Sequence, residues 1–225
     1  MGAEPPVLRC RGLTRIFGSG HTARPAVDRV DAAVPPGARI ALTGPSGSGK
    51  TTLLHLFAGL DAPTSGAIEW PGLSADPHRD RTRIGVVFQA PSLLETLDVT
   101  ENVEIALLLA GTPADRARSR AQATLHRLEL DALGRRLPDE LSGGQLHRVA
   151  LARVLAGSAE MLLVDEATGQ LDHRTGSRVL DALFETADRS GAALILSTHD
   201  PVVANRCPVI WSMRAGRLDT ARVPP

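Results

Sequence analysis

The sequence predicts an α/β protein in which a mainly parallel sheet is flanked by helices. Three features of its 225 residues support this prediction. Short apolar segments of strand length alternate with longer segments of helical periodicity, which is the pattern of a parallel sheet covered by helices. A glycine-rich loop joins one strand directly to a helix. The middle of the chain, roughly residues 90–158, is mainly helical, so we expect an inserted α-helical subdomain there.

Apolar periodicity places the individual elements along the chain. We predict strands at residues 7–17, 27–34, 39–43, 66–70, 84–88, 161–164, 193–197 and 209–213, with a final turn near Gly216. We predict helices at residues 51–60, 99–110, 113–130 and 175–189, and one more that Ser142 caps and that ends near Ala156. In the helix of residues 113–130, one face is apolar, and the arginines at positions 116, 118 and 120 are expected to be a solvated surface.

Length and charge restrict the classes of protein to consider. A chain of 225 residues can build one well-buried α/β domain, and a second would be cramped, so we expect residues 1–225 to form a single domain. Its 25 basic residues balance 25 acidic ones, for a formal net charge of +0. Proteins held on nucleic acid by charge carry a basic excess. We therefore expect no nucleic-acid partner.

The sequence also bears on location. Its start has neither a basic region nor an apolar stretch, and no apolar run approaches the roughly 18 residues that a spanning helix needs. A role at a membrane must then come through a partner. Cys10 and Cys207 lie far apart and outside any metal-binding spacing. We expect both to be reduced thiols, which fits a cytosolic protein.

The glycine-rich loop is the strongest chemical signal. It matches the pattern GxxxxGK[ST] in full, with a strand before it and a helix after it, which predicts a P-loop NTPase. Glycines let backbone N–H groups wrap a phosphate, and the helix adds the positive end of its dipole. The only lysine of the chain, Lys50, is expected to reach the terminal phosphates, and the Thr51 hydroxyl to bind Mg²⁺. The residues assigned to the nucleotide here are Gly44, Pro45, Ser46, Gly47, Ser48, Gly49, Lys50, Thr51 and Thr52.

Two acidic residues follow the apolar strand of residues 161–164. Asp165 lies where an Mg²⁺ partner is expected at the carboxyl edge of an α/β sheet. Glu166 is a candidate general base for the attacking water. Many buried strands end in acids at a turn, and the upstream P-loop is what favours the metal and base roles here.

Residues 141–145 (Leu-Ser-Gly-Gly-Gln) open a helix and predict a second phosphate-recognising element. An anion site at a helix N-terminus can form from Ser142, Gly143, Gly144 and Gln145, although a plain capped helix start has the same pattern. The P-loop already holds phosphates in the same chain. We therefore expect these four residues to face the nucleotide of a second copy, so that ATP joins two copies into a dimer.

Together, these motifs resemble the ATP-binding cassette family of transport ATPases, in that family's order and over nearly the whole chain. Residues 141–145 match its signature sequence. The resemblance implies an antiparallel N-terminal β subdomain, and ATP and Mg²⁺ as cofactors. It also implies that Gln89 senses Mg²⁺ and the membrane partner, His199 contacts the γ-phosphate, Asp172 communicates across the dimer, and Phe17 stacks on adenine.

The chain departs from the family pattern at few positions. Ala167 stands where a proline usually follows the general base, and Leu146 and His147 replace a polar pair after the signature. Neither change removes a phosphate, metal or base contact, so we expect a competent ATPase. Residues 86–103 are similar to the branch that serves lipoprotein release, macrolide export and cell division.

This resemblance implies a mechanism. Two copies would sandwich two ATP molecules, and closure would assemble Glu166, His199, Mg²⁺ and water around the γ-phosphate. The helical subdomain and the Gln89 region would pass the motion to integral membrane permease subunits. We therefore expect a cytoplasmic protein, peripheral on the inner face of the cell membrane through its permease. Export or lipoprotein release is the expected coupled process.

Other classes of protein also use a P-loop. A regulatory GTPase needs the guanine-reading Asn-Lys-x-Asp, and this chain has no lysine outside its P-loop. Among soluble ABC ATPases, DNA-repair members insert coiled coils or zinc modules and translation members carry paired cassettes, and neither feature is present. A short iron–sulfur assembly ATPase or a regulatory scaffold stays open as an alternative.

Overall fold

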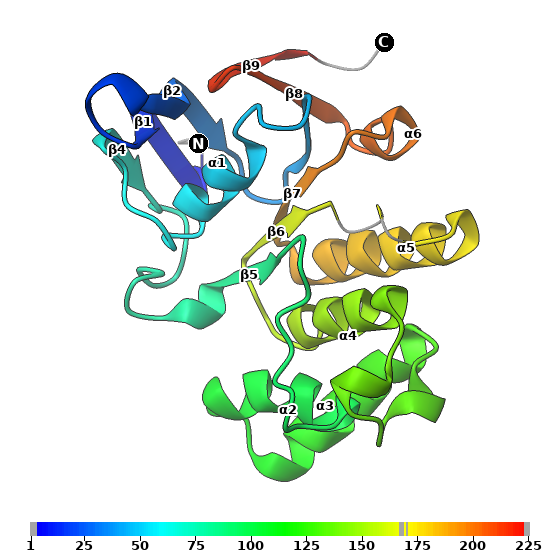
Figure 1. The fold of residues 1–225 in the computed structure, drawn as a ribbon. Coiled ribbons are helices and arrows are strands. Elements are labelled where there is room, and N and C mark those ends of the chain that lie inside the picture. Colours follow the sequence, from blue (N-terminus) through cyan, green and yellow to red (C-terminus); the bar gives the residue numbers. More distant parts are fainter. Residues whose placement is uncertain (1–3, 167–168, 170, 223–225) are drawn as a thin grey trace.

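Two sheets and a group of helices build the protein, which a computed structural model describes for residues 4–166, 169 and 171–222 (Figure 1). The smaller sheet has three antiparallel strands in the order β2-β1-β4. Its strands are β1 (Leu8–Phe17), β2 (Arg24–Val34) and β4 (Ser65–Glu69). The expected antiparallel N-terminal subdomain is therefore confirmed.

The larger sheet has six strands in the order β5-β6-β7-β3-β8-β9. All neighbours pair in parallel except β8 and β9, which form a hairpin. Its strands are β3 (Arg39–Thr43), β5 (Ile84–Val87), β6 (Met161–Asp165), β7 (Ala193–Ser197), β8 (Val209–Arg214) and β9 (Arg217–Arg222). The sequence predicted only a turn near Gly216, because the mainly polar β9 has no apolar period of its own.

The helices are α1 (Lys50–Phe57), α2 (Val99–Leu109), α3 (Ala114–Arg127), α4 (Gly143–Leu155), α5 (His173–Ser190) and the short α6 (Pro201–Ala204). Two helices, α1 and α3, end three residues earlier than predicted. Gly59, at φ +64°, follows the end of α1, and Glu129, at φ +55°, follows the end of α3. A left-handed residue cannot continue a right-handed helix. Pro113 is the N-cap of α3 rather than its first helical residue.

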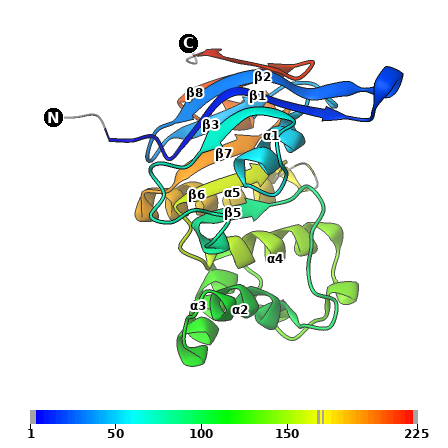
Figure 2. The same ribbon diagram turned by 90° about the vertical axis from the view of Figure 1, so that its left-hand side faces the viewer.

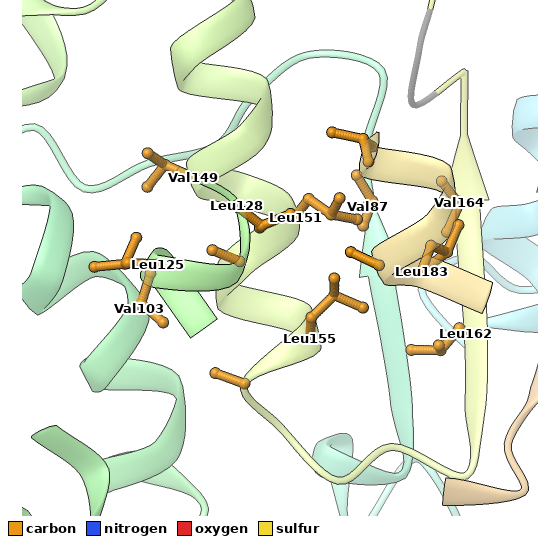
Figure 3. Close-up of a cluster of buried hydrophobic side chains, with 14 of the residues drawn as sticks. Val87, Val103, Leu125, Leu128, Val149, Leu151, Leu155, Leu162, Val164 and Leu183 are labelled. Atoms are coloured by element: carbon orange, nitrogen blue, oxygen red, sulfur yellow. The ribbon is translucent and has the colours of Figure 1, made fainter. Parts of the chain in front are cut away.

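Side chains alternate along the central strands, and each face of the large sheet has its own core. On β6, Met161 and Leu163 pack with α1 and the antiparallel sheet, whereas Leu162 and Val164 pack with α4 and α5. Figure 3 shows this second core, in which α4 lies between the β5–β6 edge and the helices α2 and α3. Burial of both faces explains the continuous apolar runs that the sequence shows in β6 and β7.

The helices α2, α3 and α4 are inserted between β5 and β6 and lie on the side away from the antiparallel sheet (Figure 2). The apolar face predicted for α3 is buried there. The arginines at positions 116, 118 and 120 are exposed, as predicted, and two of them also make contacts within the chain. Arg120 donates a hydrogen bond to the Ala156 carbonyl at 2.6 Å, and Arg118 pairs with Glu104 at 2.8 Å. Arg120 thus satisfies a carbonyl at the end of α4 that has no partner within its helix. Within the described residues, no helix has the length and apolar character required to span a membrane.

Candidate active site

The predicted catalytic residues converge at one edge of the six-stranded sheet. Four neighbouring parallel strands, β5, β6, β7 and β3, end there. The loops after them carry Gln89, Glu166, His199 and the P-loop, respectively. Because the strands run parallel, residues from distant parts of the sequence meet at their carboxyl ends, where α/β sheets bind ligands.

The P-loop is shaped by close contacts that only glycine allows. A Cβ on Gly44 would lie 2.2 Å from the Met213 carbonyl oxygen, and a Cβ on Gly49 would lie 2.0 Å from that of Ala26. Both glycines also have positive φ, at +149° and +105°. The loop therefore turns tightly against β2 and β8 before α1 begins at Lys50. Its glycine spacing is a steric requirement of this fold.

Lys50 is 7% exposed, and its ammonium group stays close to its own loop. Its Nζ donates to the carbonyl oxygens of Gly44 at 2.9 Å and Pro45 at 3.2 Å. A phosphate offers an ammonium group a stronger, charged acceptor than a carbonyl. The loop therefore places the positive charge of Lys50 at the start of α1. The helix dipole there adds to the attraction for an anion such as a phosphate.

The residues beside this loop fit a magnesium ion. The Thr51 hydroxyl donates to Oδ2 of Asp165 at 2.6 Å. Hydroxyl and carboxylate oxygens are the hard ligands that Mg²⁺ prefers, and it is usually held by one or two carboxylates together with substrate phosphates. No group of three or more His, Cys, Asp or Glu side chains suited to a metal occurs among the described residues. The donor set thus suits an ion that phosphate oxygens help to bind.

Glu166 is the meeting point of three loops. Its Oε2 accepts a hydrogen bond from Nε2 of Gln89 at 3.4 Å, and its Oε1 lies 3.5 Å from Nδ1 of His199. Glu166 itself has φ +51°, the left-handed region that non-glycine residues seldom adopt. Such an outlier is kept only where its surroundings hold it, and it often marks a functional site.

One cavity of about 470 Å³ brings together much of the P-loop, the catalytic candidates and Phe17. Its walls include residues of the P-loop and α1, the three catalytic candidates and the aromatic ring proposed for adenine: Ser46, Gly47, Gly49, Lys50, Thr51, Thr52, Gln89, Glu166, His199 and Phe17. Phe17 is 47% exposed at the end of β1, and the Arg15 guanidinium lies 4.6 Å from the centre of its ring. An exposed aromatic ring in the wall of a phosphate site is suited to stacking on a base.

A second cavity of about 280 Å³ adjoins the first, since Glu166 and His199 line both. Asp172 is part of its wall. The Asp172 side chain also caps α5 by accepting the Thr175 N–H at 3.0 Å, and this hydrogen bond is the main cause that lowers the pKa of Asp172. Asp172 therefore has a structural role besides its place next to the catalytic candidates.

The second phosphate-recognising element lies elsewhere in the chain. Ser142 is the N-cap of α4, as predicted, and its hydroxyl accepts the Gln145 N–H at 3.4 Å. The Gln145 side chain accepts the Ser142 N–H at 2.8 Å, which completes a capping box. Ser142 and Gly143 are exposed to solvent. Ser142, Gly143, Gly144 and Gln145 are not among the residues that line the P-loop cavity of the same chain.

Among the residues that depart from the family pattern, the structure describes His147. His147 is 3% exposed on α4, and neither ring nitrogen has a hydrogen-bond partner within the described part of the chain. Burial lowers its pKa, so the neutral ring is favoured. Ala167 lies outside the described residues.

Two residues at this edge, Ser197 and Arg153, were not among the site residues predicted from the sequence. Ser197, the last residue of β7, hydrogen-bonds to Asp165 and to the backbone N–H of Glu166. Arg153 of α4 donates to Ser92, three residues beyond Gln89. A polar residue at the end of an apolar strand was the available signal for Ser197. No local pattern indicated Arg153, because its partner lies 61 positions away.

Comparisons with known proteins agree with this geometry. The model of the ABC transporter family matches residues 27–169, more than half of the chain. The lipoprotein-releasing system ATP-binding protein LolD of Chromohalobacter salexigens is 38% identical over 220 residues, which cover 94% of this chain and 92% of that protein. The macrolide export ATP-binding/permease protein MacB of Rhodopseudomonas palustris is 42% identical over 217 residues, but the match covers only 33% of its length.

A solved structure supports the same assignment. The ATP-binding cassette MJ0796, as a dimer in a post-hydrolysis state bound to ADP and Pi, superposes with a TM-score of 0.87 at 30% sequence identity. The match covers 96% of this chain and 99% of that one. The chain therefore belongs to the ABC transporter family and is an ATP-binding, ATP-hydrolysing subunit of the type represented by LolD and MacB.

Proposed function

We propose that two copies of this chain close around two ATP molecules and that the edge cavity is one half of each site. Ser46 to Thr52 and Gly44 wrap the phosphates, Lys50 binds the terminal ones, and Phe17 stacks on adenine. Thr51, Asp165 and Gln89 hold Mg²⁺, which neutralises phosphate charge when bound. The observation that carries the proposal is the approach of Gln89 and His199 to the Glu166 carboxylate, at 3.4 and 3.5 Å.

In this proposal Glu166 is the general base that takes a proton from the attacking water. His199, on the opposite side of the same carboxylate, is placed to contact the γ-phosphate, and Gln89 orients the Glu166 side chain. Asp172, beside Glu166 and His199, faces the second copy. Hydrolysis then removes the contact that bridges the two copies, and the dimer opens.

The other half of each site comes from α4 of the second copy. Ser142 and Gly143 are exposed, and the N–H groups of Gly143 and Gly144, which the capping box does not use, lie at the positive end of the α4 dipole. A phosphate bound at Lys50 of one copy can accept hydrogen bonds from that helix start. A dimeric ADP- and Pi-bound cassette among the solved relatives supports this arrangement.

We further propose that residues 1–225 are one nucleotide-binding domain, with residues 90–158 as the helical subdomain that meets integral membrane permease subunits. The protein would then be cytoplasmic and peripheral on the inner face of the cell membrane. Its similarity to LolD and MacB favours lipoprotein release or export as the coupled process. Co-purification with an integral membrane protein distinguishes this from a soluble iron–sulfur assembly ATPase or a regulatory scaffold.

The Glu166→Gln variant tests the catalytic proposal. It should bind ATP and form a closed dimer, while the release of phosphate falls on the order of 10²–10⁴-fold because the base is lost. Glu185→Gln, a change of an exposed residue on α5, is the matched control and should keep wild-type turnover. Near-normal turnover in Glu166→Gln would reject the general-base role. Unchanged ATP affinity in Lys50→Ala would reject the P-loop assignment.

The shared site has its own test in the Glu166→Gln background. Ser142→Arg should abolish the ATP-dependent dimer, measured by light scattering, while each monomer still binds ATP. Ser119→Arg places the same bulk and charge on an exposed position of α3 and should leave the dimer intact. A dimer that survives Ser142→Arg would show that the helix start of α4 does not face the nucleotide.

A further inference from the structure

Ser197, on β7, lies next to Asp165 and Glu166, the two acidic residues at the end of β6. It is the last residue of β7 and is fully buried, at 0% exposure. In the parallel pairing of β6 and β7, Ser197 stands opposite Asp165. It does not line either cavity at the edge of the sheet. Ser197 can therefore act on the chemistry only through its neighbours.

The Ser197 hydroxyl makes two hydrogen bonds, one to each acidic residue. It donates its proton to Oδ1 of Asp165, and it accepts the backbone N–H of Glu166 at 3.1 Å. The same N–H also points to the Ser197 carbonyl oxygen, at 3.3 Å. A hydroxyl has one donor and two acceptor positions, so a single side chain can serve both partners at once.

The bond to Asp165 fixes the direction of its carboxylate. With Oδ1 engaged by Ser197, the other oxygen, Oδ2, is turned toward Thr51 and accepts its hydroxyl at 2.6 Å. Asp165 is itself 5% exposed, so water has little access to replace a missing partner. Removal of the Ser197 hydroxyl would free the carboxylate to rotate away from the Thr51 side of the site.

The bond to Glu166 holds a strained backbone. Left-handed φ is unfavourable in a residue with a Cβ, because the Cβ comes too close to the following carbonyl oxygen. The turn is nevertheless what aims the carboxylate between Gln89 and His199. The hydroxyl and the carbonyl oxygen of Ser197 both accept the Glu166 N–H, and so hold the start of this turn.

We propose that Ser197 is a positioning residue that aligns the metal-binding carboxylate of Asp165 and the general base Glu166 through one hydroxyl. This inference rests on the roles proposed above for those two residues. Ser197 lines neither cavity at the edge of the sheet, so its loss should leave the binding of ATP without metal unchanged. It should instead lower turnover and raise the Mg²⁺ concentration needed for half-maximal rate.

Threonine and valine at position 197 separate the hydroxyl from side-chain volume. Ser197→Thr keeps the hydroxyl, and Ser197→Val has the shape of threonine without a hydroxyl. Relative to the threonine variant, we expect the valine variant to lose about 10–100-fold in kcat and to need more Mg²⁺ for half-maximal rate, which is the range for residues that orient metal ligands. Ser197→Ala adds no volume and should show the same loss relative to wild type. ATP affinity in EDTA should stay within about twofold in every variant.

Three results would overturn the proposal. Equal kcat in the valine and threonine variants, with wild-type Mg²⁺ dependence in Ser197→Ala, would mean that the hydroxyl has no positioning role. A weaker affinity for ATP in EDTA would mean that it acts on the P-loop instead. A thermal midpoint that falls in proportion to kcat would mean a merely structural role. Ser190→Ala, which removes a hydroxyl that donates to the Thr186 carbonyl at the end of α5, is the control for stability.

The outcome is separable from that of the proposed function. If Glu166→Gln hydrolyses ATP normally, the assignment of the general base fails whatever Ser197 does. If Glu166→Gln is inactive and the Ser197 variants match wild type, only the positioning role fails.

Discussion

The guanidinium of Arg153 reaches from α4 to Ser92 in the loop that follows Gln89. Its Nη1 donates to the Ser92 carbonyl at 2.8 Å, and its Nη2 donates to the Ser92 hydroxyl at 3.0 Å. The helix that Ser142 caps is thus joined to the loop that carries Gln89. Movement of α4 against the sheet would pull on that loop directly.

Loss of this contact should destabilise the protein. Arg153→Ala should lower the free energy of unfolding by about 1.5–3 kcal/mol, because hydrogen bonds to charged groups contribute that much. Urea unfolding monitored by circular dichroism measures the change. Arg116→Ala, at an exposed position of α3, should shift the midpoint far less. Equal midpoints for the two variants would show that the Arg153–Ser92 contact contributes nothing to stability.

Stability should fall at acidic pH because of His147. Burial lowers the pKa of its folded-state imidazole, whereas the unfolded chain binds the proton near the ordinary value of about 6.5. The unfolded state therefore holds more protons below that pH, and the free energy of unfolding decreases as the pH falls from about 6.5 toward the folded pKa. Urea midpoints measured at about pH 7.5 and about pH 5.5 should differ in the wild type.

His147→Leu should reduce that difference, since leucine cannot take up a proton in the buried site. His21→Gln removes an exposed histidine and should leave the pH dependence as it is. If His147→Leu and wild type lose stability equally between the two pH values, another group causes the acid sensitivity.

The two cysteines should react slowly with thiol reagents in the native protein. Both are free and buried, and burial raises the pKa of Cys10 and of Cys207 to about 11. The thiolate is the reactive form, so labelling by a chromogenic disulfide near pH 8 should be on the order of 100-fold slower than after denaturation. Rapid labelling of either thiol in the native state would contradict its burial.

Two glycines with similar backbone angles should respond differently to alanine. Gly49 and Gly111 have φ of +105° and +80°, but a Cβ on Gly111 meets nothing within 4 Å. Gly111→Ala should therefore cost only the strain of the left-handed region, roughly 1–2 kcal/mol. Gly49→Ala also drives a Cβ into the Ala26 carbonyl, and should abolish nucleotide binding, measured with a fluorescent ATP analogue. ATP binding by Gly49→Ala at wild-type affinity would contradict the described loop.

The features that could be predicted from the sequence are those that depend on neighbours in the chain. The P-loop, the strand that ends in Asp165 and the cap at Ser142 are local patterns, because backbone sterics, hydrogen bonding and apolar periodicity act over a few residues. They were enough to predict an α/β fold with a helical insertion. They failed at the ends of α1 and α3, where Gly59 and Glu129 turn left-handed, and at the polar edge strand β9.

Hydrogen bonds between groups that are distant in the sequence depend instead on how the elements pack. Gln89 and Glu166 are 77 positions apart, Asp165 and Ser197 are 32 apart, and Arg120 meets Ala156 across 36. The order of strands in the parallel sheet and the packing of α3 on α4 bring these pairs together, and nothing within a few residues of either partner encodes that order. For this reason the contact of Arg120 with Ala156 and the hydrogen bonds of Ser197 were not predicted.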